Sequence, residues 1–198
     1  LYHWDLPQAL QDRGGWATRD TIDAFGRYVK VVTSALGDRV KSWATHNEPW
    51  CIAFLGHHTG EHAPGLEDRK VALQVAHNVL VSHGKAVPII RQQVPDAEVG
   101  IVLNFSPAYP ATDTEADRAA TELHHQKFNR WFLDPIMGRG YPQLAWDAYG
   151  DDVPEVVDGD MECMDPQLDF LGVNYYSRRV CEDPSSEGGE VLHERDDD

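Results

Sequence analysis

Four short apolar runs alternate with helical patterns along the 198 residues, and this alternation most constrains the fold. Strands that are separated in sequence by whole helices pair in parallel, through right-handed crossovers. The predicted strands are 1–7, 39–45, 98–104 and 168–177. The predicted helices are 20–36, 69–93, 114–131 and a short one near 143–149. We therefore predict an α/β fold built on a parallel sheet.

The helix boundaries follow from local residue chemistry. Thr18 or Asp20 is placed to cap the first helix, and Gly37 follows its end. Within the second helix, Pro88 lacks a backbone donor, so we expect a kink or an end there. The stretch 50–67 is expected to be a loop.

The motif Thr45-His46-Asn47-Glu48-Pro49 lies where the second predicted strand ends. Side chains at the carboxyl ends of parallel strands meet substrate in α/β folds and in (β/α)8 barrels above all. Glu48 is therefore a candidate acid, with Asn47 beside it. Asn-Glu-Pro also occurs in ordinary turns, so a purely structural reading of this motif stays open.

Polar and aromatic residues gather at the ends of the other predicted strands. His3 and Trp4 lie at the end of the first strand, Asn104 ends the third, and Asn174 and Tyr176 lie at the end of the fourth. A His-Trp pair at a strand end also serves packing, and an asparagine there also ties down a loop.

The strand-end motifs, in this order and at these separations, resemble those of the family 1 glycoside hydrolases, the retaining β-glucosidases and their relatives. The resemblance covers nearly the whole chain and implies a TIM (β/α)8 barrel. The four strands would then be roughly the third to sixth of eight. Since such a barrel takes about 250 residues, residues 1–180 are expected to be its middle part, followed by an acidic loop or tail at 181–198.

The resemblance also implies a role for each strand-end residue. Glu48 would be the acid/base catalyst. Tyr176 would orient the nucleophilic carboxylate, and Asn47 would bond the sugar hydroxyl next to the anomeric carbon. The residues expected to bind substrate are His3, Trp4, Asn47, Asn104, Asn174 and Tyr176.

The nucleophile itself is expected outside these residues. Hydrolysis with retention takes two carboxyl groups about 5 to 5.5 Å apart. The family's second carboxylate belongs to a Thr-Glu-Asn-Gly-like motif on strand seven, and no Glu-Asn pair occurs in the 198 residues. We therefore expect at most trace β-glucosidase activity from this chain alone.

The amino-acid composition limits the kinds of partner that the chain is expected to bind. With 33 acidic and 17 basic residues, the formal charge of −16 argues against nucleic acid, which needs a basic face. No apolar run is long enough to span a membrane. Cys51, Cys163 and Cys181 are scattered, which fits a reducing compartment and a cytoplasmic protein. Metal-ligand spacing is absent, so we expect neither a metal nor a cofactor.

Other functions remain open. A β-galactosidase, a β-fucosidase or a 6-phospho-β-glucosidase of the same family would share these residues. A noncatalytic carbohydrate-binding half-barrel is the alternative from another class. In either case a barrel cut through its sheet has two unpaired edges, so we expect self-association through them.

Overall fold

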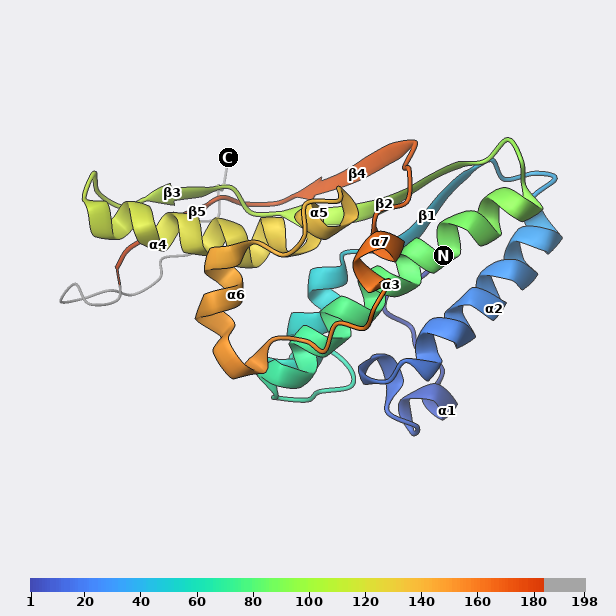
Figure 1. Ribbon diagram of the computed structural model, residues 1–198, viewed down its shortest axis with the longest axis horizontal. Coiled ribbons are helices and arrows are strands. Elements are labelled where there is room, and N and C mark those ends of the chain that lie inside the picture. Colours follow the sequence, from blue (N-terminus) through green and yellow to red (C-terminus); the bar gives the residue numbers. More distant parts are fainter. Residues whose placement is uncertain (184–198) are drawn as a thin grey trace.

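The computed structural model of the chain describes residues 1–183, in which helices alternate with parallel strands (Figure 1). The strands are β1 Ser42–Asn47, β2 Glu98–Phe105, β3 Ala108–Pro110, β4 Phe170–Tyr175 and β5 Arg179–Cys181. The α-helices are α1 Gln8–Gln11, α2 Asp20–Leu36, α3 Arg69–Gln93, α4 Glu115–His125, α5 Trp131–Ile136, α6 Gln143–Tyr149 and α7 Asp160–Met164. Shorter elements are the 3-10 turns Gly15–Ala17 and Gly150–Asp152 and the π-helical turns Cys51–Leu55 and Gln126–Arg130.

The main sheet has three parallel strands in the order β1-β2-β4. Tyr2 adds a parallel bridge to His46 at the other edge of β1. The predicted parallel sheet is confirmed, but the first predicted strand, 1–7, contributes only this bridge. The reason is that the backbone turns into the left-handed region at Trp4, with φ 79°.

Helix α3 packs against β1, β2 and α2, and Figure 1 shows α2 and α3 together on one side of the strands. Fifteen of the 25 residues of α3 are buried. Tertiary packing of this extent offsets the one backbone hydrogen bond that Pro88 cannot donate. The expected interruption at Pro88 therefore does not occur, and the helix runs from Arg69 to Gln93 as one element.

Helix α2 has the predicted bounds but not the predicted cap. Arg19 occupies the N-cap position without a capping side-chain hydrogen bond. The Thr18 hydroxyl instead donates to the Gly15 carbonyl oxygen (3.2 Å), in the 3-10 turn that precedes the helix. Asp20 is the first helical residue rather than the cap.

The helix predicted over 114–131 continues further. Thr114 caps α4 through its hydroxyl, which accepts from the Asp117 amide. The chain then passes through the π-helical turn Gln126–Arg130 into α5, which ends at Ile136. The short helix α7 was not expected from the sequence.

Two further boundaries differ from expectation. Strand β1 begins and ends later than the predicted 39–45, because pairing with β2 starts at Ser42 and reaches Asn47. The predicted loop 50–67 contains the π-helical turn Cys51–Leu55, directly after the Glu-Pro pair.

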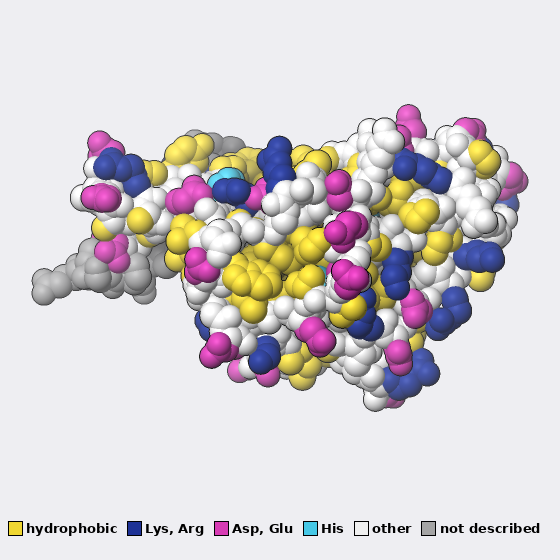
Figure 2. Space-filling model, viewed as in Figure 1, with side chains coloured by type: hydrophobic (Ala, Val, Ile, Leu, Met, Phe, Trp, Pro, Cys, Tyr) yellow, Lys and Arg dark blue, Asp and Glu magenta, His cyan; other side chains and the backbone are white. Residues whose placement is uncertain are grey.

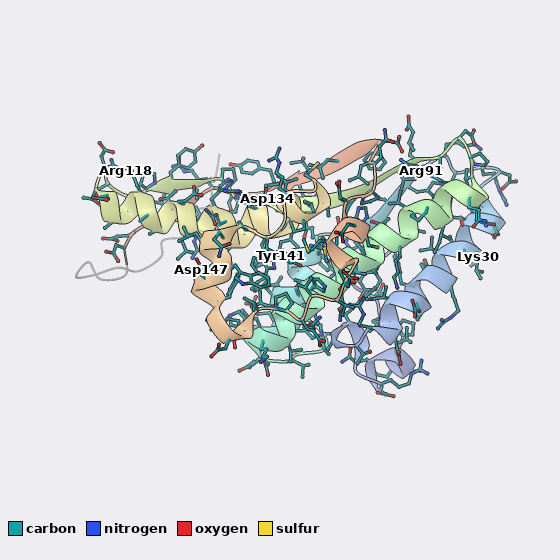
Figure 3. The ribbon with its side chains drawn as sticks, viewed as in Figure 1. Lys30, Arg91, Arg118, Asp134, Tyr141 and Asp147 are labelled. Carbon is teal, nitrogen blue, oxygen red and sulfur yellow. The ribbon has the colours of Figure 1, made fainter. Side chains whose placement is uncertain are left out.

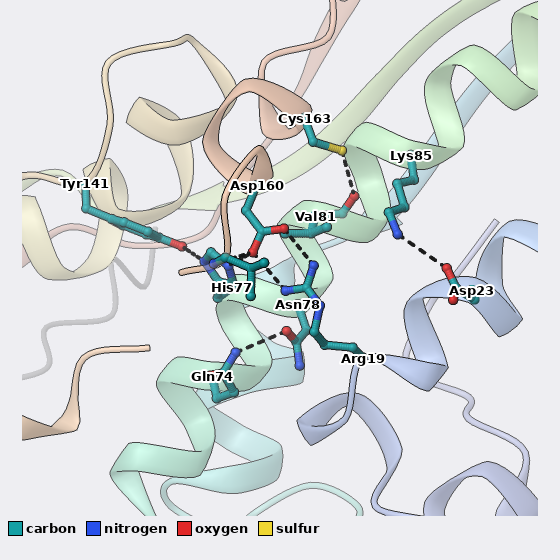
Figure 4. A network of polar contacts seen from close by, with 11 residues as sticks. Arg19, Asp23, Gln74, His77, Asn78, Val81, Lys85, Tyr141, Asp160 and Cys163 are labelled. Carbon is teal, nitrogen blue, oxygen red and sulfur yellow. Dashed lines mark hydrogen bonds and ion pairs between the residues drawn. The ribbon is translucent and has the colours of Figure 1, made fainter. Parts of the chain in front are cut away.

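An ionic network around the buried side chains of Asp160 and His77 joins distant parts of the chain (Figure 4). Asp160 accepts two hydrogen bonds from the guanidinium of Arg19 (2.7 and 2.8 Å) and one from Nε2 of His77 (2.9 Å). The Nδ1 atom of His77 then accepts from the Tyr141 hydroxyl (2.9 Å). The network links the entrance of α2, the middle of α3 and the start of α7.

An ion pair also connects α3 with the sheet. Arg91, labelled in Figure 3, donates to the carboxylate of Asp169 (2.9 Å). The same carboxylate accepts from the Val99 amide (2.8 Å), at the beginning of β2. Because Asp169 immediately precedes β4, this side chain fixes the start of two neighbouring strands.

Strands β3 and β5 form a separate two-stranded parallel pair. Strand β5 ends at Cys181, one residue beyond the boundary expected at 180. The Asp183 amide then donates to Asp117 (2.8 Å). The remainder of the expected acidic tail, 184–198, lies outside the described residues.

In residues 1–183, no helix is long and apolar enough to cross a membrane. Within the same range, no group of three or more His, Cys, Asp or Glu side chains is arranged to hold a metal ion. Figure 2 shows Lys and Arg side chains interspersed with Asp and Glu around a hydrophobic area on the face that it draws.

Candidate active site

Glu48 lies immediately after β1 and is held by backbone contacts on both sides. Its amide donates to the Val102 carbonyl of β2 (2.8 Å), and the pairing of β1 with β2 shifts between Ala44 and Asn47. The φ of Glu48 is 48°, in the left-handed region that non-glycine residues rarely adopt. The residue is only 4% exposed. The strand end thus holds the carboxylate in one fixed place.

Three side chains donate hydrogen bonds to this carboxylate. Oε1 accepts from Nδ2 of Asn174 (2.6 Å) and from the hydroxyl of Tyr176 (3.0 Å). Oε2 accepts from the thiol of Cys51 (3.1 Å). Asn174 lies near the end of β4, next to its final residue Tyr175, and Tyr176 follows the strand, so the ends of β1 and β4 converge on one carboxyl group.

Asn47 extends this cluster toward the chain start. Its Oδ1 accepts from Nδ2 of Asn174 (3.2 Å), and its Nδ2 lies 3.4 Å from Nε2 of His3. The indole of Trp4 donates to the Asn47 carbonyl (2.9 Å), and its ring centroid lies 4.9 Å from that of His3. Asn47 and Asn174 therefore lie beside Glu48, with the imidazole of His3 and the indole of Trp4 next to Asn47, so hydrogen-bonding and aromatic groups gather at this strand end.

Asn104 also lies at this edge, in β2, directly paired with Asn174 of β4. Paired residues of neighbouring parallel strands place their side chains on the same face of the sheet. The structure thus brings all seven predicted site residues to the carboxyl ends of neighbouring strand segments, six of them through the contacts above and Asn104 through its register with Asn174.

The neighbours of Glu48 respond to its charge. The hydrogen bond and the charge of Glu48 raise the pKa of Tyr176. Burial, followed by the hydrogen bond to Glu48, raises the pKa of Cys51. Both groups therefore stay protonated at neutral pH and act as hydrogen-bond donors.

Two contacts differ from the sequence expectation or were absent from it. Tyr176 was expected to bond the nucleophilic carboxylate, whereas here its hydroxyl bonds Glu48. Cys51 was not predicted as a site residue, because the segment after Pro49 was expected to be a loop. Its position three residues after Glu48 is the spacing of one helical turn, which is the signal that could have identified it.

A cavity of about 750 Å³ lies next to the cluster, and Glu48 is not part of its lining. Trp4, Trp16, Cys51 and His57 line it. Since its walls lack the carboxylate, we place the candidate active site on the cluster around Glu48 rather than in this cavity. The rings of Trp50 and Phe128 contact each other in a tilted arrangement, with centroids 4.6 Å apart.

The sequence profile described as Glycosyl hydrolase family 1 matches residues 1–198 of the chain. The chain belongs to glycosyl hydrolase family 1. Its fold is accordingly part of the family's TIM barrel, as predicted.

Known members are similar throughout the chain. Beta-glucosidase A of Acetivibrio thermocellus is 46% identical over 192 residues, which are 96% of this chain and 43% of that protein. The AHE enzyme from Alicyclobacillus herbarius superposes with a TM-score of 0.91 at 47% identity, covering 97% of this chain and 45% of that one. The family 1 β-glucosidase from Thermotoga maritima superposes with a TM-score of 0.90 at 41% identity, covering 98% of this chain and 44% of that one. The chain thus spans less than half the length of these family members.

Proposed function

We propose that these residues are the central part of a retaining β-glucosidase in which Glu48 is the acid/base catalyst. The observation that carries this proposal is the buried carboxylate of Glu48, fixed at a strand end and bonded by Asn174, Tyr176 and Cys51. Membership in glycosyl hydrolase family 1 and the β-glucosidases among its similar relatives support the reaction class.

In this proposal Glu48 protonates the departing glycosidic oxygen and then takes a proton from the water that releases the sugar. Asn47 bonds the hydroxyl next to the anomeric carbon, and its contact with Asn174 keeps the amide oriented. The attacking carboxylate is supplied by sequence outside these 198 residues. His3, Trp4 and Asn104 bind the sugar at the same edge.

The substrate is a small β-glycoside. Support comes from structures of relatives: SghA was solved with its substrate analogue salicin, and the Thermotoga maritima β-glucosidase with deoxynojirimycin. A favoured second candidate is a 6-phospho-β-glycosidase, because GmuD of Bacillus subtilis, a 6-phospho-beta-glucosidase, is 37% identical. Hydrolysis of p-nitrophenyl β-glucoside, β-galactoside, β-fucoside and 6-phospho-β-glucoside distinguishes these possibilities. A noncatalytic half-barrel would hydrolyse none of them.

The decisive variant is Glu48→Gln in the full-length protein that contains these residues. We expect it to lower turnover of glucosides with poor leaving groups about 10²- to 10⁴-fold, the usual contribution of a general acid. Activated aryl glucosides need little protonation, so their first step should be affected far less. Steady-state kinetics on both substrate types measures the difference.

The exposed Glu61→Gln provides a matched control, because it makes the same chemical change in the loop after the helical turn. Equal losses on both substrate types for Glu48→Gln, or equal effects of the two variants, would contradict the assignment. The isolated 198-residue chain is expected to hydrolyse at most traces of either substrate.

We further propose a cytoplasmic location, in keeping with the three free cysteines of the chain. Alkylation of all three thiols under denaturing conditions, without prior reduction, is the expected result. A disulfide detected by mass spectrometry in the freshly isolated protein would contradict it.

A further inference from the structure

The two oxygens of the Glu48 carboxylate lie in different surroundings. Oε1 faces Asn174 and Tyr176, and Tyr176 is 75% exposed. Oε2 faces Cys51, which is 6% exposed. One oxygen is therefore turned toward the open side of the cluster and the other toward the protein interior.

The local backbone fixes this arrangement. The Cys51 amide donates to the Glu48 carbonyl (2.9 Å), while the Cys51 thiol donates to Oε2 of the same residue (3.1 Å). The π-helical turn Cys51–Leu55 begins at this cysteine, and its first four residues are buried. The amide of Cys51 thus bonds the backbone carbonyl of Glu48 and its thiol bonds the carboxylate, while the packed turn keeps the thiol in place.

We propose that Cys51 is a positioning residue for the acid/base catalyst: its thiol holds Oε2 of Glu48 and so fixes the rotation of the carboxyl group. The inference rests on the function proposed above. A hydrogen-bond donor interacts more strongly with a charged carboxylate than with a neutral carboxylic acid, so loss of the Cys51 thiol should be visible in the pH dependence of the reaction. The titratable side chains that contact this carboxylate are Cys51 from the helical turn and Tyr176 beyond β4.

The protonation state of Cys51 agrees with this role. Burial is the main cause that raises its pKa, and the hydrogen bond and charge of Glu48 act in the same direction. The sulfur therefore donates rather than accepts across the working pH range. A packing role alone would require only an apolar group of similar size at this position.

The two roles separate in the variants Cys51→Ser and Cys51→Val of the full-length protein. Serine keeps a donor, whereas valine keeps an apolar side chain and loses the donor. For Cys51→Val we expect kcat to fall about three- to tenfold with little change in KM, the effect of one lost hydrogen bond. The alkaline limb of its kcat/KM profile should move up by about half a pH unit, because the acid keeps its proton longer.

For Cys51→Ser we expect the original pH profile to be retained. Cys163→Ala is the matched control, because that thiol lies near the Val81 carbonyl and does not contact Glu48. A pH profile that moves equally in the serine and valine variants, or in neither, would overturn the inference. If Glu48→Gln leaves turnover of poor leaving groups intact, the proposed function fails instead.

The reactivity of the Cys51 thiol tests its contact with Glu48 in a second way. This test needs neither an activity measurement nor a substitution of Cys51. We expect Cys51 to react with iodoacetamide more rapidly in Glu48→Gln than in the unsubstituted protein, because the variant lacks the charge that disfavours the thiolate. Peptide mapping by mass spectrometry resolves Cys51 from Cys163, whose rate should stay unchanged. Equal Cys51 rates in the two proteins would refute the hydrogen bond.

Discussion

Glu48, the residue that carries the proposed chemistry, has a rare backbone conformation. A non-glycine residue in the left-handed region costs about 1 to 3 kcal/mol. The surroundings maintain this conformation through the Val102 carbonyl, which binds the Glu48 amide, and through the three donors on the carboxylate. The contacts that maintain the strained backbone of Glu48 therefore also fix the direction of its carboxylate.

Two glycines in neighbouring helices allow a residue-level test of packing. A Cβ at Gly84 of α3 would lie 1.8 Å from the backbone oxygen of Cys163, which cannot move without displacing α7. A Cβ at Gly26 of α2 would meet only the end of the Ile89 side chain, at 3.3 Å. The two positions share a helical backbone but differ in their neighbours.

We expect Gly84→Ala to lower the free energy of unfolding by about 2 kcal/mol, because the overlap outweighs the gain in helix propensity. Gly26→Ala should raise it by about 0.5 to 1 kcal/mol. Urea denaturation followed by tryptophan fluorescence measures both. The same change in stability for the two variants would show that α3 and α7 do not pack this closely.

At the scale of elements, the Asp160 network anchors the outer helices. Burial alone would raise the pKa of Asp160, but the hydrogen bonds from Arg19 and His77 outweigh it and hold that pKa well below its usual value. Burial lowers the pKa of His77, which stays neutral and so can donate from Nε2 and accept at Nδ1. The network is therefore one fully bonded unit.

Asp160→Ala should lower the free energy of unfolding by about 2 to 3 kcal/mol, because it leaves the buried His77 donor without a partner. The matched control is Asp38→Ala, which removes the exposed ion pair with Arg39 and should change stability by less than about 1 kcal/mol. Thermal and urea unfolding report the difference. Similar losses for both variants would mean that the network contributes no more than a surface pair.

Two buried histidines between β1 and α3 make the stability depend on pH. Nε2 of His46 bonds the Ser82 hydroxyl (2.8 Å), and Nδ1 of His83 bonds the Thr45 hydroxyl (2.7 Å). Burial lowers the pKa of His46 well below its usual value and that of His83 to about 3. Neither imidazole readily accepts a proton while the protein is folded.

The unfolded chain binds protons at these histidines below pH 6.5, whereas the folded chain does not. Stability is therefore expected to be intact above pH 6.5 and to fall progressively as the pH decreases toward 3. Urea denaturation between pH 7.5 and 4.5 measures the slope. His83→Gln should reduce that slope relative to a variant at the exposed His58, and an unchanged slope would rule out His83 as its source.

At the scale of the whole molecule, the sheet has open edges. In the order β1-β2-β4, strand β4 has no described partner on its second side. Val173 and Tyr175 of β4 are 60% and 54% exposed. Exposed strand edges that carry apolar side chains promote pairing with another copy.

We therefore expect the isolated chain to dimerise or aggregate in sedimentation velocity experiments. Val173→Lys places a charge on the β4 edge and should reduce this association. Val31→Lys, at a residue of α2 that is 68% exposed, should leave it unchanged. A compact monomer with a sharp melting transition for the unsubstituted chain would contradict the prediction.

Local sequence patterns predicted those helices whose apolar periodicity and end residues lie within the segment itself. The bounds of α2, α3 and α6 agree with the predicted ranges, because apolar periodicity and flanking residues define them within the segment. The strand-end residues His3, Asn47, Glu48, Asn104, Asn174 and Tyr176 were likewise identified by their positions in motifs. Their convergence followed from the rule that parallel strands end at the same edge of a sheet.

Only the tertiary structure determined the features that depend on distant partners. Strand β1 was displaced to Ser42–Asn47 because β2 sets its register, and α3 passed through Pro88 because packing around the helix offsets the missing donor. The contact of Cys51 with Glu48 required the turn after Pro49 to be helical. The sequence by itself thus determined the family, the order of the main helices and strands, and the positions of the candidate site residues, since local motifs encode them. Register, helix continuation and hydrogen-bond partners depend on the energy of contacts between segments far apart in the chain.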